Sequence, residues 1–220
     1  MANVNRPQGF KPVRHLNGSK FNGQSNLYYI PSTDSNAYAV GDLVTFVGTT
    51  SSTVSQIWPN YPVGIPIVTR ASNGAAVVVL GAIVGFLADP TNLQNSGYRP
   101  ASNANGAFVW VADAPDIVYE AQLCGASAAA IAPNVAAAAG TNYIGLNAQI
   151  NTTNAAAANY GAGLSNMMVD ASTVATTATL PLKIIRYSAR VDQDLSVAGF
   201  YPKVEVIVNT PFLGYGVAGI

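Results

Sequence analysis

The side chains that could carry out nucleophilic or metal-dependent chemistry are few in this sequence and lie far apart. His15 is the only histidine and Cys124 is the only cysteine. A catalytic triad or a cysteine–histidine pair needs a base held rigidly by its neighbours, and His15 lies in a segment without strand or helix periodicity. A metal site built from several histidines is excluded because the chain has only one. We therefore expect Cys124 to be a small buried apolar residue, and the protein to hold no metal or other cofactor.

The carboxylates give no stronger indication of an enzyme. Asp113, Asp116 and Glu120 are the densest group, and a glycosidase pair would need them on opposed faces of a cleft with one raised pKa. A hairpin turn with a solvated rim explains them more simply. Asp192 and Asp194 are not followed by the later ligands of a calcium loop. Phosphate-binding and nucleophile-elbow motifs do not occur, so the sequence predicts a protein that is not an enzyme.

Charge is scarce along the whole chain. Of the 220 residues, ten are Lys or Arg and ten are Asp or Glu, which is 9% charged with a formal net charge of zero, whereas an ordinary soluble domain is about 25% charged. A nucleic-acid binder needs an excess of cations, so we expect no nucleic-acid partner. The best candidate membrane span, residues 71–88, is interrupted by Gly81 and Gly85, and its apolar part is too short. Because the N-terminus also lacks the apolar core of a signal peptide, we expect no membrane partner.

The pattern from residue 27 onward is typical of an all-β protein. Short runs rich in Val, Ile, Thr and Tyr alternate with clusters of Gly, Pro, Asn, Ser and Asp, which favours an antiparallel β-barrel or sandwich. We expect strands 107–111 and 117–122 to pair as a hairpin, and the final strand to alternate with its valines facing the core. The predicted strands are 27–30, 42–47, 65–70, 77–87, 107–111, 117–122, 180–187 and 203–208.

The first 26 residues have a different character. They carry four of the ten cations, and no acid appears before Asp34. Proline and glycine interrupt any helix or central strand there, while Phe10 and Phe21 provide apolar points. The sequence predicts an extended basic N-terminal arm over residues 1–26 and a single β-rich body over residues 27–220. The alternative is a solvated terminus without a fixed structure.

The middle of the chain lacks charge altogether. No charged residue occurs in residues 121–169, which are rich in Ala and Asn. Alanine favours helix, but Pro133, Gly140 and Gly145 limit any helix to one or two turns. We expect a small Ala-rich insertion with little helix, whose small uncharged residues suit close packing against another protein. A low-complexity loop without such a role is the alternative.

Several segments resemble a known group of structural proteins. The opening RPQGFKPVRHLNGSKFNGQ, residues 6–24, resembles the N-terminus of certain tailed-bacteriophage proteins. Those proteins usually continue with further short segments in the same order as in this chain. The matching pieces here are YIP at 29–31, GDLV at 41–44, GIPIVT at 64–69, IVGF at 83–86, YRPAS at 98–102, VADAPDIVYEAQ at 111–122, GLNA at 145–148 and DASTVATTATLPLKI at 170–184.

The resemblance implies a function in the virion. Members of this group look like head decoration, or cement, proteins, which sit on the outer surface of the capsid and clamp neighbouring capsomers. It implies the major capsid protein as partner, and we expect self-association as a homotrimer. Our hypothesis is that the arm contacts an acidic or apolar surface of the capsid protein. The residues expected to do so are Arg6, Phe10, Lys11, Arg14 and Phe21.

Two other functions remain open at this stage. The chain could be another virion structural component, such as a tail or fibre-base protein, because the same composition suits any part of a particle. It could also be a carbohydrate-binding module that recognises host-surface glycans, since exposed Tyr and Trp side chains stack on sugars as readily as they anchor a protein interface.

Overall fold

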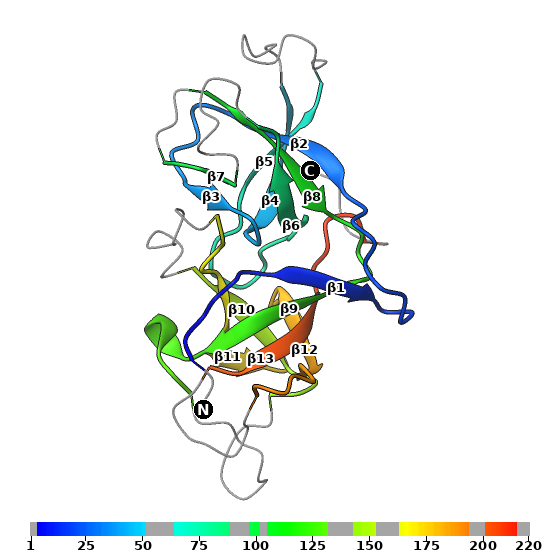
Figure 1. The fold of residues 1–220 in the computed structure, drawn as a ribbon, viewed down its shortest axis with the longest axis vertical. Helices are drawn as coiled ribbons and strands as arrows, with labels where there is room; N and C mark the ends of the chain where they lie inside the picture. Colours follow the sequence, from blue (N-terminus) through cyan, green and yellow to red (C-terminus); the bar gives the residue numbers. More distant parts are fainter. Residues whose placement is uncertain are drawn as a thin grey trace, which may run out of the picture.

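The computed structural model describes residues 4–51, 64–88, 97–101, 105–131, 143–152, 163–193 and 201–214 (Figure 1). Within these ranges the chain is almost entirely β, with thirteen strands and one short 3-10 turn at Ala126–Ala128. The predicted all-β class is confirmed. Most strand pairs are antiparallel as expected, but β2 with β5 and β9 with β11 are parallel. No helix in the described ranges has the length and apolar character needed to cross a bilayer.

The first part of the chain forms a closed five-stranded barrel with the order β2-β5-β4-β6-β8. Its strands alternate between the interior and the surface: Val109 and Val111 are fully buried, whereas Trp110 between them is 38% exposed. Two short strands, β3 (Tyr38–Ala39) and β7 (Tyr98–Arg99), pair beside it. The barrel strands are β2 (Asn26–Ile30), β4 (Leu43–Thr50), β5 (Pro66–Arg70), β6 (Gly81–Phe86) and β8 (Ala107–Ala112).

The second part is a six-stranded sheet with the order β1-β9-β11-β10-β12-β13. Because β9 also pairs with β13, five of these strands close into a second ring. The sixth strand, β1, shares one edge of β9 with β11: β1 pairs with residues 117–120, and β11 with residues 123–124. The strands are β1 (Lys11–His15), β9 (Ile117–Cys124), β10 (Asn147–Asn151), β11 (Met168–Ala175), β12 (Leu182–Tyr187) and β13 (Lys203–Val208).

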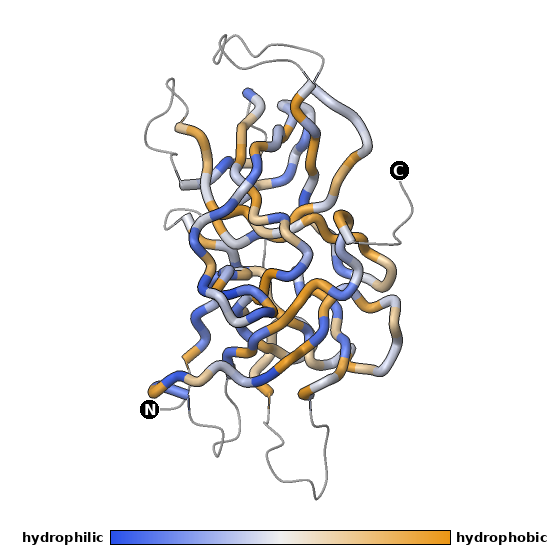
Figure 2. Tube along the Cα trace, turned by 90° about the vertical axis from the view of Figure 1, so that its right-hand side faces the viewer, coloured by the Kyte–Doolittle hydropathy of each residue, from blue (hydrophilic) through white to orange (hydrophobic). Residues whose placement is uncertain are grey.

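The barrel and the second ring are stacked along the long axis of the molecule and share a core (Figure 1). The largest buried cluster combines Leu43 and Ala82 of the barrel with Tyr119 and Val206 of the second ring. The Tyr119 hydroxyl donates a 2.7 Å hydrogen bond to the carbonyl of Ala112 at the end of β8. Figure 2 shows hydrophobic and hydrophilic positions alternating along several strands, as expected where one strand face is buried.

The positions of the eight predicted strands agree with the structure, but one predicted pairing is wrong. Each predicted strand overlaps an observed one, although the regular strand within residues 77–87 covers only Gly81–Phe86. Strands β8 and β9 do not form a hairpin, because both edges of β8 are occupied by β2 and β6 in the closed barrel. Residues 113–116 instead carry the chain from the barrel to the second ring. Asp113 accepts hydrogen bonds from Asn26 and Tyr28 of β2, which fixes this crossing.

The uncharged segment 121–169 contributes to the core of the second ring. Its described residues include the end of β9, all of β10 and the start of β11, and the 3-10 turn at Ala126–Ala128 is the one helical turn among them. Ala148 and Ile150 of β10 are fully buried. Both four-alanine runs, 136–139 and 155–158, lie outside the described residues. The small side chains are therefore used at least partly for packing inside this chain.

A buried carboxylate joins the barrel to the second ring. Asp42, which is almost fully buried, accepts hydrogen bonds from the Ala39 amide and the Ser165 hydroxyl. Gly9 packs against the same point with φ +67°, and a side chain there would overlap the carbonyl oxygen of Gly41. Burial raises the pKa of Asp42 to about 6, although the hydrogen bonds from Ser165 and Ala39 oppose the shift.

The raised pKa predicts a pH-dependent stability that Asp42→Asn removes. The fold favours the protonated carboxyl, so the stabilisation from Asp42 is complete below about pH 4 and is lost as the pH rises through about 6. The free energy of unfolding of the wild type should therefore fall relative to Asp42→Asn by on the order of 3 kcal/mol between pH 4 and pH 7. Urea denaturation of both proteins across this range measures it. A difference that does not change with pH would contradict the raised pKa.

Candidate functional site

The N-terminal segment packs along the chain's own second ring. Strand β1 pairs with the first half of β9, and the Phe10 side chain is fully buried in the shared core. The Phe10 amide also donates a 2.8 Å hydrogen bond to the Gly41 carbonyl. The predicted anchor Phe10 therefore inserts into the chain's own core. That the segment also contacts another protein stays a prediction.

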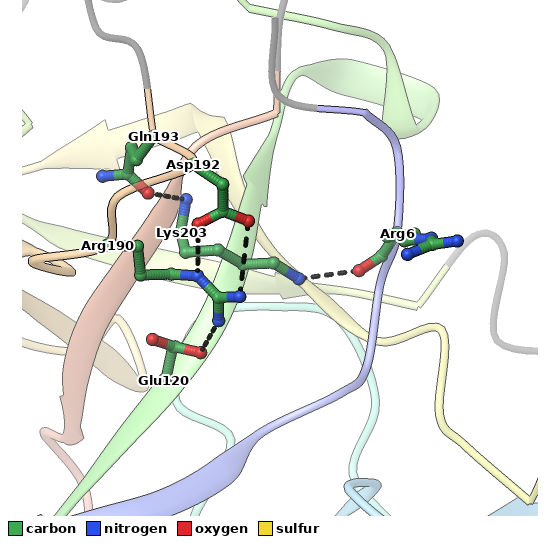
Figure 3. A network of polar contacts seen from close by, with 6 residues as sticks. All are labelled: Arg6, Glu120, Arg190, Asp192, Gln193 and Lys203. Carbon is green, nitrogen blue, oxygen red and sulfur yellow. Dashed lines mark hydrogen bonds and ion pairs between the residues drawn. The ribbon is translucent and has the colours of Figure 1, made fainter. Parts of the chain in front are cut away.

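Side chains of the second ring hold the main chain of Arg6 from both sides, and Figure 3 shows the contact from Lys203. The Arg6 amide donates to Gln122 Oε1 at 2.9 Å, and Lys203 Nζ donates to the Arg6 carbonyl at 2.7 Å. Gln122 Nε2 also donates to the Asn5 side chain at 2.8 Å. Burial lowers the pKa of Lys203 to about 8. The Arg6 side chain points away from these contacts and is exposed, so its charge stays available to a partner.

Four charged residues lie side by side across the strands β1, β9, β13 and β12. In register, Lys11 is opposite Glu120, Glu120 is opposite Glu205, and Glu205 is opposite Arg186. Two carboxylates thus occupy directly opposed positions on neighbouring strands, where like charges repel. Such a pair requires compensating cations close by.

Arginines from three parts of the chain supply that compensation. Glu205 accepts hydrogen bonds from Arg14 Nη2 at 2.8 Å and from Arg186 Nη2 at 2.7 Å. Glu120 accepts one from Arg190 Nη1 at 2.9 Å, and Arg190 also binds Asp192 (Figure 3). Burial opposes ionisation of Glu205, but the hydrogen bonds from Arg186 and Arg14 outweigh it and hold its pKa below the usual range.

These residues form one surface, which we call the charged face. Its centre is the Glu120–Glu205 pair. A second row of residues crosses the same strands beside this pair and carries a cation at each end: Arg14, opposite Val118, and Lys183, opposite Ile207. Cations outnumber acids on this face although the whole chain has no net charge. The cations are Arg6, Lys11, Arg14, Lys183, Arg186, Arg190 and Lys203, and the acids are Glu120, Asp192 and Glu205.

Phe21 lies apart from the charged face, beside an open groove on the barrel. The Phe21 ring is half-buried against the shared core. The groove has a volume of about 600 Å³, and the exposed indole of Trp110 forms part of its wall. Its lining residues are Phe21, Gly23, Ser25, Val84, Gly85 and Trp110.

The predicted arm residues are thus divided between three places. Arg6, Lys11 and Arg14 lie together on the charged face, Phe10 is in the core, and Phe21 is at the groove. Sequence reasoning missed the cations and acids that the C-terminal third adds. The period-2 alternation of residues 203–208 correctly predicts that Lys203 and Glu205 face away from the core valines, but no sequence signal showed that β13 lies between β9 and β12. The missed residues are Lys183, Arg186, Arg190, Asp192, Lys203 and Glu205.

The two nucleophile or base candidates do not meet. His15 is paired with Ile117 at one end of β9, while Cys124 is at the other end, a separation on the order of 20 Å at the usual rise of a strand. Nδ1 of His15 lies 3.1 Å from the Asp116 carboxylate. Burial raises the pKa of Cys124 to about 12, so its thiol stays protonated and unreactive at neutral pH. Among the residues that the structure describes, no three His, Cys, Asp or Glu side chains gather as metal ligands.

Because Phe10 is buried in the core, its removal should destabilise the whole protein. We expect Phe10→Ala to lower the free energy of unfolding by about 3 to 5 kcal/mol, since truncating a buried phenylalanine loses apolar burial and leaves a cavity. Guanidinium denaturation measures the change. The matched control Phe21→Ala should have a clearly smaller effect because that ring is only half-buried. Equal effects of the two substitutions would mean that the N-terminal segment is not docked in solution.

Comparisons with protein-family models, with curated proteins and with solved structures found no match to this chain. A function therefore has to be inferred from the chain's own residues, from its two stacked β rings and from the charged face. The charged face is the feature in which the predicted arm residues and the C-terminal strands act together.

Proposed function

We propose that this chain is a structural virion protein, a decoration or cement protein that binds the outside of a tailed-phage capsid. In this role it stabilises the contacts between capsomers of the major capsid protein. The charged face is the observation that carries the proposal. It gathers cations from both ends of a chain that has few charges and no net charge.

The geometry of the charged face suits an acidic protein surface. Arg14 and Arg186 are held by Glu205, and Arg190 is held by Glu120, so these side chains keep fixed positions. Arg6 and Lys11 are exposed at the border of the face. Complementary charge provides orientation and a fast association rate more than raw affinity. Many copies on a closed shell then convert weak individual contacts into a stable attachment.

The sequence resemblance points to the same part of the molecule. The motif RPQGFKPVRHLNGSKFNGQ covers the segment that forms β1 and that is held at the Arg6 main chain by Gln122 and Lys203. It contains all three arm cations of the charged face. The rigid all-β body would present this segment at a constant angle to the shell. A homotrimer on the outer surface of the head is the arrangement that we propose.

One observation favours a second candidate function, carbohydrate binding. Trp110 is 38% exposed and lines an open groove together with Phe21 and Ser25. An exposed indole beside a hydroxyl can stack on and hydrogen-bond to a sugar ring. Binding to a glycan array that Trp110→Ala abolishes would support this candidate.

Binding to capsids tests the proposal directly. We expect the double variant Arg6→Glu/Lys11→Glu to bind purified capsids that lack the protein at least about tenfold more weakly than the wild type, because two exposed attractive charges become repulsive. Because Lys11→Glu also places a carboxylate opposite Glu120, the unfolding of the variant is measured in parallel, and binding is compared under conditions in which both proteins are folded. Cosedimentation at physiological salt measures the affinity.

The matched control preserves charge at both positions. Arg6→Lys/Lys11→Arg should bind as the wild type does. Unchanged binding of the charge-reversed variant would contradict a role for the charged face. Electron cryo-microscopy of particles carrying labelled protein separates the head from other locations: density on the tail or fibre base, with none on the head, would favour the other virion assignment.

A further inference from the structure

Residues 4–21 form a structural unit of their own within the N-terminal segment. After β1 the chain turns back, and the Phe21 amide donates to the Val13 carbonyl at 3.3 Å. Arg14 and Lys20 form an antiparallel bridge across the turn, and the His15 amide donates to the Ser19 carbonyl. This N-terminal hairpin has its own internal hydrogen bonds, so it can move as one piece.

The surface that receives the N-terminal hairpin is built mostly from β9 and β13, far along the chain, with Gly41 at the start of the barrel beside them. Its main contacts are the ladder between β1 and β9, the clamp on Arg6 by Gln122 and Lys203, the ion pair of Arg14 with Glu205, and the core cluster around Phe10. None of these contacts involves the residues that link the hairpin to β2. The receiving surface is therefore equally complete whether the hairpin comes from the same chain or from another copy.

The linker between the hairpin and the barrel, residues 22–25, has the properties of a hinge. Asn22, Gly23 and Gln24 are exposed. Gly23 has φ +89° with open space where a side chain would be, and the Ser25 hydroxyl donates to the Gly23 carbonyl within the linker itself. A change in the direction of the linker would therefore disturb few contacts.

We propose that the N-terminal hairpin exchanges between neighbouring copies, so that residues 4–21 of one copy dock on β9 and β13 of the next. Exchange keeps every docking contact and adds only a reorientation of the linker, which makes it a low-cost route to an oligomer. A second copy is the occupant that fits, because it supplies the phenylalanine, the arginine and the edge strand in the order that the receiving surface requires. Copies with zero net charge do not repel each other.

The assembled state makes exchange competitive with docking within one chain. When copies are held side by side, the effective concentration of a neighbour's hairpin rises far above that in dilute solution. If the hairpin of one copy is displaced, the edge of β9 loses its partner over residues 117–120 and must be filled by another. This inference goes beyond the proposed function, since it concerns how copies are joined and holds for any surface that they cover.

Disulfide trapping between two variants that each carry one introduced cysteine tests the exchange. Lys11 and Glu120 are directly opposite on β1 and β9, so cysteines at these positions can bond when the strands pair. Lys11→Cys and Glu120→Cys, carried on chains of different mass, are coexpressed and oxidised at the protein concentration used for assembly. The native Cys124 does not interfere because its side chain is fully buried.

A covalent heterodimer of the two variants, in a substantial fraction of the chains, is the expected result. Neither variant expressed alone should give this disulfide-linked dimer. Asn17→Cys, on the exposed turn, is the control, and it should give little dimer when it is coexpressed with Glu120→Cys. The double variant Lys11→Cys/Glu120→Cys shows that the positions can react at all, because its disulfide forms either within a chain or between chains. Disulfide formation in the double variant only within single chains, together with no heterodimer from the mixture, would overturn the proposal.

Discussion

The second ring depends on the neutralisation of two carboxylates that face each other on adjacent strands. Glu120 of β9 and Glu205 of β13 are in direct register, and their repulsion would oppose the pairing of the two strands. Arg14, Arg186 and Arg190 relieve it through hydrogen bonds of 2.7 to 2.9 Å. Because these arginines come from β1, from β12 and from the segment after β12, one electrostatic requirement ties three distant parts of the chain to one surface.

The need to neutralise Glu120 and Glu205 also explains where a chain with so few charged residues places them. Half of the charged residues lie on the charged face, and the strands behind it pack against an apolar core that continues into the barrel. Besides its strand pairing, the N-terminal segment is held there by the burial of Phe10 and by polar contacts to Arg6 and Arg14. A segment fixed in this way presents Arg6 and Lys11 at constant positions, which is what recognition of another charged surface needs.

Local features of this fold could be predicted from the sequence, whereas its long-range pairings could not. The alternation of Val204, Val206 and Val208 placed them correctly in the core, because strand periodicity is a local property. The prediction of a hairpin over residues 107–122 is wrong, because β8 pairs with β2 on one edge and β6 on the other in the closed barrel and has no free edge for β9. At the site, the arm cations could be singled out by composition. Their partner Glu205 could not, because it is 191 residues from Arg14 and no local pattern links the two.

A double-mutant cycle between Arg14 and Glu205 tests most directly whether the charge pairing holds the N-terminal strand to the body. The free energy of unfolding is measured for the wild type, Arg14→Gln, Glu205→Gln and the double variant. A favourable coupling energy of about 1 to 3 kcal/mol is expected for two residues joined by this ion pair. Coupling indistinguishable from zero, with effects of the two substitutions that simply add, would contradict the account.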